Sequence, residues 1–225
     1  MERLLAVAVV VPLLAFSGLM GTAMASYPGG TWEDPHETSH SQLRNYFCDL
    51  ERPVALNGQP NDFGAACADW SLVAFSIALA PFFLAAPRVF AQRKRLGQVV
   101  AISGVLCALG GVGIVLVPSY KYGAAVHGVA VLLAAVPGLT AIIATTVGHY
   151  GARSSAPAIW KAAALTLVVT ALSVAVFAVQ LMRGVETTTG LPVLEKLAVF
   201  GSMVWMVLTV RETMRIKRAT GVTPS

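Results

Sequence analysis

Long apolar runs separated by short polar stretches dominate the chain. Six of these runs carry almost no charge over about 17 residues or more, which is the length that a helix needs to cross a bilayer. They lie at Leu4–Ala25, Trp70–Ala86, Val99–Val117, Gly123–Val147, Ala162–Met182 and Val193–Val210. Glu195 and Lys196 open the last run, so both are expected near a membrane interface. The pattern predicts an all-α bundle of six transmembrane helices that forms a single integral membrane domain over residues 1–225.

The composition excludes the classes of protein that such a pattern could otherwise mimic. Hydrophobic residues make up 56% of the 225 residues and charged residues only 12%, and the mean hydropathy is +0.71. A soluble domain averages about 25% charged residues, and a disordered chain carries few aliphatic residues. Three cysteines are too few for a disulfide scaffold. A multi-pass membrane protein is the class that remains.

Charge is distributed unequally between the two sides of the predicted bundle. Eleven of the 16 Lys and Arg residues fall in the segments on one side, whereas nine of the 11 Asp and Glu residues fall on the other. Cytoplasmic loops are enriched in Lys and Arg, so the basic side is predicted to be cytoplasmic, with both termini inside. The basic runs at 88–95 and 211–218 then face anionic lipid, and no nucleic-acid partner is expected.

The first apolar run has two interpretations. The sequence AMAS at 23–26 resembles a signal-peptide cleavage site, which would remove the run from the mature protein. The run exceeds 20 residues, however, and the three residues before it are nearly neutral, which is atypical of a signal peptide. We therefore predict a retained transmembrane helix.

One long polar segment, residues 26–69, is predicted to lie outside the membrane. It contains seven acidic residues, two histidines and two cysteines, and loops of this length are usually functional or disordered. Apolar side chains recur in it at helical spacing, at Leu43, Tyr46, Phe47 and Leu50. This spacing predicts a short amphipathic helix over Ser41–Glu51 that lies on the bundle or on the membrane surface.

Two motifs resemble those of a bacterial six-helix membrane family, the one catalogued as domain of unknown function 998. The sequence HSQLRNYFCDL at 40–50 resembles the motif that follows the first helix of that family, with Cys48 where the family has Ser. The sequence VPSYKYGAAVHGVAVLLA at 117–134 resembles the start of its fourth helix. Such proteins are distantly similar to the Frag, DRAM and Sfk membrane proteins, which are linked to lipid handling. The resemblance implies a bacterial plasma-membrane location and a role for four residues, Arg44, Asn45, Asp49 and His127.

We expect these four residues to form one polar cluster at the outer mouth of the bundle. Asn45 and Asp49 are one helical turn apart, and Arg44 is placed to pair with Asp49 or Glu195. His127 lies about a turn inside the fourth helix, where an ionisable side chain is a functional candidate and a structural hydrogen bond is the alternative. The cluster predicts a non-enzymatic protein that binds a membrane lipid or another amphiphile and needs no cofactor.

Two other functions stay open. His36, His40, His127 and Asp49 offer the ligand types that zinc takes, so a metal-assisted membrane hydrolase is one alternative. His36 and His40 share a face only if their stretch is helical, and the late apolar runs lack the paired histidines of known membrane hydrolases of this kind. The other alternative is an accessory subunit whose 26–69 segment docks a membrane protein partner or a second copy of the chain.

Cys48 and Cys67 both fall in the predicted external segment. An oxidising exterior permits a disulfide between them, which would close a loop of about 20 residues and stabilise the fold by about 3 kcal/mol. Cys48 on a buried helix face is an equally good interpretation, because a free cysteine behaves as a small apolar residue.

Overall fold

The computed structural model describes residues 2–152, 157–185 and 190–220, and six helices in this part of the chain are long and apolar enough to cross a membrane. The protein is thus a multi-pass membrane protein, and the six predicted spans are confirmed. The long helices are α1 (Glu2–Ser26), α3 (Asp62–Ala85), α4 (Lys94–Leu116), α6 (Ala124–Gly151), α7 (Pro157–Arg183) and α8 (Leu191–Thr220). Shorter elements are α2 (Phe47–Leu50), the 3-10 helix η1 (Ala86–Phe90) and α5 (Ser119–Tyr122).

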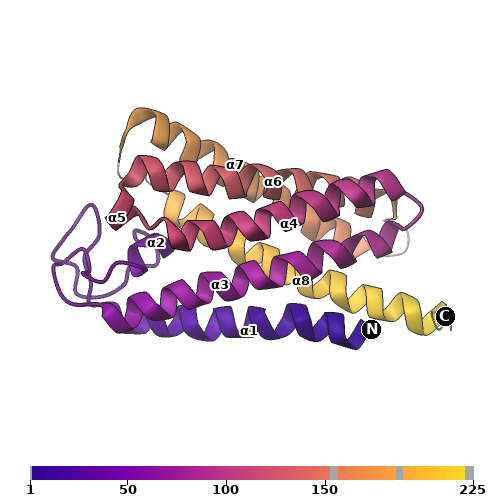
Figure 1. Ribbon diagram of the computed structural model, residues 1–225, viewed down its shortest axis with the longest axis horizontal. Helices are drawn as coiled ribbons and strands as arrows, with labels where there is room; N and C mark the ends of the chain where they lie inside the picture. Colours follow the sequence, from indigo (N-terminus) through magenta and orange to yellow (C-terminus); the bar gives the residue numbers. More distant parts are fainter. Residues whose placement is uncertain (1, 153–156, 186–189, 221–225) are drawn as a thin grey trace.

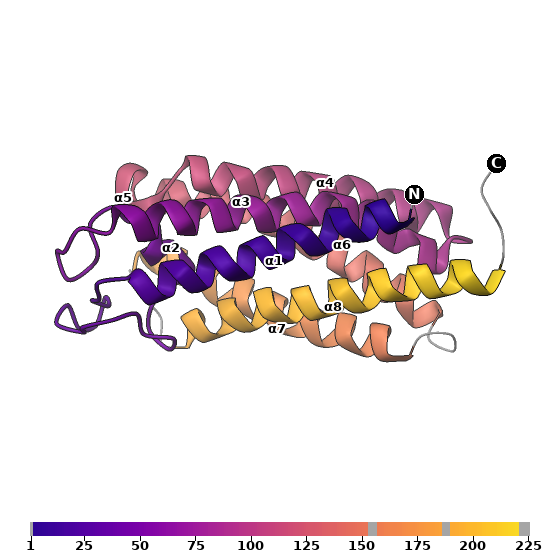
Figure 2. The ribbon, with the colours of Figure 1, turned by 90° about the horizontal axis from the view of Figure 1, so that it is seen from below.

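The long helices run up and down along one axis (Figure 1). The most extensive contacts are those of α1 with α3, α4 with α3 and α6, and α7 with α6 and α8, and α8 also contacts α1. The segment 27–61, here called the 27–61 loop, includes α2 and lies at one end of the bundle together with α5. We call this the loop end. Helix α1 begins and α8 finishes at the opposite end, here called the terminal end (Figures 1 and 2).

Helix α3 begins at Asp62, eight residues before the predicted start at Trp70, so the loop between the first two long helices is shorter than expected. Asn61 precedes the helix, and its side-chain amide donates hydrogen bonds to the carbonyls of Leu50 (3.0 Å) and Arg52 (2.9 Å). The amide therefore ties the start of α3 to the 27–61 loop. Hydropathy missed the first two turns of α3 because Asp62 and Asp69 interrupt the apolar sequence there.

The predicted helix over Ser41–Glu51 is wrong for its first six residues, because α2 spans only Phe47–Leu50. The side chain of Asn45 explains the difference. Its Oδ1 accepts a hydrogen bond from the backbone of Ser41 (2.9 Å) and its Nδ2 donates to the carbonyl of Gly30 (2.9 Å). Such side-chain bonds to the backbone compete with the helical ladder and favour turns.

The apolar face that was predicted for the Ser41–Glu51 helix is buried in part. Tyr46, Phe47 and Leu50 are buried against the bundle, whereas Leu43 is 68% exposed. Phe47 and Leu50 belong to a core at the loop end that also contains Phe16 of α1. The contact of α2 with the bundle therefore depends on three apolar residues rather than four.

Two glycines fold the 27–61 loop back on itself. Gly29 and Gly30 have φ angles of 122° and 87°, which favour glycine, and a Cβ at Gly30 would collide with the backbone of Leu56 and Asn57. The backbone N–H of Asn57 donates to the carbonyl of Gly29 (3.2 Å). This close approach places Trp32 above the helices, where it contributes to the site described next.

Candidate functional site

A cavity of about 350 Å³ lies between α3, α4, α6, α7 and α8, beneath the 27–61 loop. On α6 its wall extends from Ala124 to Ala135, a rise of about 16 Å along the helix. Most of the wall is apolar and includes Leu72, Phe75, Leu79, Ile114, Val131, Val174, Phe177 and Val199. This volume is within the range of small-molecule binding sites, which are typically about 300–1,000 Å³.

Three carboxyl groups line the cavity at the loop end. Asp49 and Glu51 reach it from the 27–61 loop, and Glu195 reaches it from the first turns of α8. His127 and Gln180 add polar atoms from α6 and α7. The cavity therefore has a polar end and an apolar body, as an amphiphile has.

Asp49 lies at the centre of a hydrogen-bond network and is 3% exposed. Its Oδ1 accepts from Trp32 Nε1 (2.9 Å), and its Oδ2 accepts from the backbone of Tyr46 (2.8 Å) and from Asn45 Nδ2 (3.3 Å). Burial raises the pKa of Asp49, while these hydrogen bonds act to lower it. The structure thus brings together Asn45 and Asp49, which the sequence placed one turn apart.

The last two long helices fix this network in place. Glu195 Oε2 accepts a hydrogen bond from the backbone N–H of Phe47 (3.0 Å), at the start of α2. Lys196 Nζ donates to the backbone carbonyl of Asn45 and lies 5.4 Å from the centroid of the Phe47 ring. Tyr46 Oη donates to Gln180 of α7 (3.1 Å). The loop is therefore attached to residues more than 130 positions away in the sequence.

Glu51 differs from the other carboxyl groups at the cavity. It is 1% exposed, and neither of its carboxyl oxygens has a hydrogen-bond partner among the described residues. Burial is the main cause that raises its pKa well above the usual value, and Asp69, Glu195 and Asp49 raise it further. Sequence analysis did not single out Glu51, although it is one of the acids in the segment predicted to be external.

His127 is 6% exposed in the first turns of α6 and lines the cavity. Its Nδ1 lies 2.7 Å from the backbone carbonyl of Val117. Helix α4 ends at Leu116, so the carbonyls of its last turn need partners from outside the helix. The structural hydrogen bond that was the alternative interpretation of His127 is present, and its partner is a backbone carbonyl.

Arg44 lies outside the cavity, and its predicted pairing with Asp49 or Glu195 is wrong. Its guanidinium pairs with Glu33 (3.6 Å) and Glu37 (3.8 Å), and about half of its side chain is exposed. The turn that replaces the predicted helix directs Arg44 toward these acids. Of the four predicted residues, Asp49 and His127 line the cavity, Asn45 supports Asp49 and Arg44 is on the surface.

The predicted alternative metal ligands lie in three different environments. His36 is exposed, and its backbone N–H donates to Asp34 Oδ1 (2.9 Å). His40 packs edge-on against Tyr27, and burial lowers the pKa of His40 to about 4. His127 is inside α6. Within the described residues, no group of three or more His, Cys, Asp or Glu side chains is arranged to hold a metal ion.

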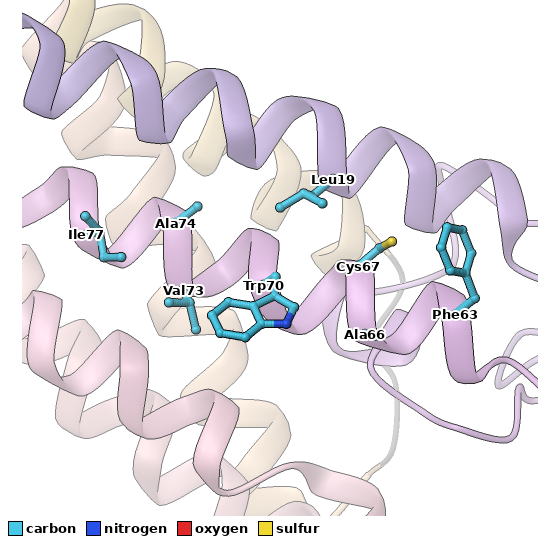
Figure 3. Close-up of a pocket in the computed structure, with 8 residues that line it drawn as sticks. All are labelled: Leu19, Phe63, Ala66, Cys67, Trp70, Val73, Ala74 and Ile77. Carbon is cyan, nitrogen blue, oxygen red and sulfur yellow. The ribbon is translucent and has the colours of Figure 1, made fainter.

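All three cysteines lie in the described residues and are free, so the structure does not contain the Cys48–Cys67 bridge. Cys48 lines the cavity, and burial raises the pKa of its thiol well above the usual value. Cys67 faces a separate groove between α1 and α3 (Figure 3). Apolar residues such as Leu19, Trp70 and Ile77 line that groove.

No family model, curated protein or solved structure matches this chain. The resemblance at 40–50 and 117–134 therefore stays a prediction. The cavity and its polar end are the basis for assigning a function.

Proposed function

We propose that the protein binds a membrane amphiphile in the cavity, with the polar group of the ligand at the loop end and its aliphatic part along the apolar wall. The observation that carries this proposal is the distribution of polarity. Asp49, Glu51 and Glu195 are gathered at one end of a cavity whose body is apolar. A site built for an ion or for a small polar metabolite would not need such an apolar body.

The geometry favours binding over catalysis. Both carboxyl oxygens of Asp49 accept hydrogen bonds within the protein, and Nδ1 of His127 is held by the Val117 carbonyl. A general acid or base needs an atom within hydrogen-bond reach of the substrate. Both oxygens of Asp49 are therefore committed to the protein, and Nε2 is the ring nitrogen of His127 that is left to contact a ligand.

We further propose that the loop end faces the exterior of a bacterial plasma membrane and that both termini are cytoplasmic. The unequal distribution of basic residues supports this orientation. A reporter that is active only in the cytoplasm should work when fused after Ser225, and a reporter that is active only outside should work near Gln59. Activity in the opposite compartments would reverse the orientation.

A cavity-filling variant tests the binding proposal. Ser173 lines the cavity from α7, and Ala175 is exposed two positions further along the same helix. Protein in phosphatidylcholine nanodiscs would be titrated with dodecanol, with empty nanodiscs as the background. We expect saturable binding by the wild type and by Ala175→Phe, and loss of binding by Ser173→Phe.

Two outcomes would contradict the proposal. One is the absence of saturable binding by the wild type to any probe with a dodecyl chain. The other is unchanged binding by Ser173→Phe, which would place the probe elsewhere, for example in the groove between α1 and α3. Stoichiometric co-purification of one defined protein would instead favour the accessory-subunit alternative.

A further inference from the structure

We propose that the head group held at the polar end of the cavity is cationic, a primary amine or a quaternary ammonium group next to Glu51. This inference depends on the proposed function, because it specifies the ligand of the same cavity. The observation that carries it is the buried carboxyl group of Glu51, which lines the cavity and has no hydrogen-bond partner among the described residues.

The charges that act on Glu51 are all negative. They come from Asp69 of α3, Glu195 of α8 and Asp49 of α2. The two nearby basic side chains are directed elsewhere. Lys196 Nζ donates to the carbonyls of Asn45 and Pro192, and the Arg52 guanidinium lies over the ring of Trp32 at 5.6 Å from its centroid. Neither basic residue lines the cavity.

Such an environment selects strongly among head groups. A carboxylate or phosphate would be repelled by the acids, and a hydroxyl offers only one donor. An ammonium group supplies the missing positive charge and up to three N–H donors to a carboxyl group that has no partner. Tyr46 also lines this part of the cavity, and aromatic faces attract ammonium and quaternary ammonium groups.

Binding of a cation should release a proton. Burial and the neighbouring acids raise the pKa of Glu51 well above its usual value, which favours the neutral form of its carboxyl group in the empty site. A cationic head group favours the carboxylate, and the proton then leaves to the solvent. A neutral head group does not favour ionisation of Glu51 and should release no proton.

The test compares three probes with the same chain and different head groups: dodecylamine, dodecanol and dodecanoic acid. Each would be titrated by calorimetry at pH 7 into protein in phosphatidylcholine nanodiscs, with empty nanodiscs as the background. Two buffers with different ionisation enthalpies would report proton release. We expect dodecylamine to bind about tenfold more tightly than dodecanol, because hydrogen bonds to charged groups are the stronger ones. Dodecanoic acid should bind weakest.

Glu51→Gln assigns the effect to this residue. It should weaken dodecylamine binding about tenfold, leave dodecanol binding unchanged and abolish proton release. Glu33→Gln is the matched control, because Glu33 is an exposed acid in the same loop that pairs with Arg44. This control should match the wild type for all three probes.

The outcomes separate the two proposals. Equal affinity for dodecylamine and dodecanol, tighter binding of dodecanoic acid, or an equal loss of both affinities in Glu51→Gln would overturn the cationic head group and leave the amphiphile site intact. Absence of binding by every probe would overturn both. The series of probes on the unaltered protein decides the question even if Glu51→Gln fails to fold.

Discussion

The two ends of the bundle are packed in opposite ways, although α3, α6 and α8 contribute to both. At the terminal end, aromatic side chains fill the space between the helices. Trp205 is 1% exposed, and its ring centroid lies 4.9 Å from that of Phe82. Phe83 and His149 also pack against Trp205, and Phe90 packs against His149. At the loop end, the helices and the 27–61 loop line a cavity of about 350 Å³ that three carboxyl groups border.

The comparison separates a closely packed end from an end that contains space for the proposed ligand. Protein interiors are normally close-packed, and an empty volume forfeits contacts between its walls. The wall of the cavity includes small residues, namely Gly111, Ala134, Ala135 and Ser173, where the terminal end has rings. The terminal end thus has a filled core, whereas at the loop end a core around Phe16 and Phe47 lies beside a cavity where the proposed ligand would add contacts.

The largest effect is expected at the terminal end. Trp205→Ala should lower the free energy of unfolding by about 3–5 kcal/mol, because it empties a filled site. Phe177→Ala should lower it by less than half as much, since Phe177 already borders the cavity. Unfolding in mixed micelles measures both values. Equal losses would mean that the two ends are packed alike.

The next effect concerns the network at the loop end. Asp49→Asn should lower the free energy of unfolding by about 1–3 kcal/mol, because an amide nitrogen cannot accept the hydrogen bonds from Tyr46 and Asn45. Glu33→Gln, at an exposed acid in the same loop, serves as the control. If Asp49→Asn leaves stability unchanged and removes only ligand-induced stabilisation, Asp49 is a ligand contact instead of a structural one.

Substitution of Glu51 should raise the free energy of unfolding, in contrast to substitution of Asp49, and the size of this gain should depend on pH. Its pKa is raised in the folded protein, so unfolding lets it lose a proton at any pH above its ordinary pKa of 4.5. Stability is therefore lost as pH rises from that value through the folded pKa. Glu51→Gln should raise stability by about 1 kcal/mol at pH 8 and leave it unchanged at pH 4. Melting temperatures across this range check the prediction, and parallel curves for the two proteins would contradict it.

The smallest change in the free energy of unfolding is expected for a residue on the outer surface of the 27–61 loop. Arg44→Ala should change the free energy of unfolding by about 0.5 kcal/mol or less, because partly exposed ion pairs are weak and are screened by salt. The same melting experiment at low and high salt measures this. A loss above 1 kcal/mol would show that Arg44 supports the cavity, as the sequence motif suggested.

The helices could be predicted because their signal is local. Each run from Leu4–Ala25 to Val193–Val210 carries its own apolar length, and each coincides with a long helix. Helical spacing predicted that Asn45 and Asp49 would meet, but Asn45 precedes α2, and a hydrogen bond from its Nδ2 to Asp49 Oδ2 brings the two residues together.

The rest of the site depends on contacts that spacing does not encode. Lys196 reaches Asn45 across 151 residues, and Glu195 reaches Phe47 across 148. The hydropathy pattern predicted that Glu195 and Lys196 lie near a membrane interface, but it predicted no partner for either residue. Glu51 was missed because its importance lies in the lack of a hydrogen-bond partner among the described residues, which only a folded structure reveals.

The attachment of the 27–61 loop to α8 sets an order for biogenesis. The loop emerges from the ribosome early, while Glu195 and Lys196 belong to the last helix. At a synthesis rate of about 5–20 residues per second, the loop waits roughly 7–30 s for its anchors. During that interval Phe47 lacks its Glu195 acceptor and the Asn45 carbonyl lacks its Lys196 donor. The polar end of the cavity therefore closes only after the final helix has inserted, and a chain truncated before α8 should keep this loop open to proteases.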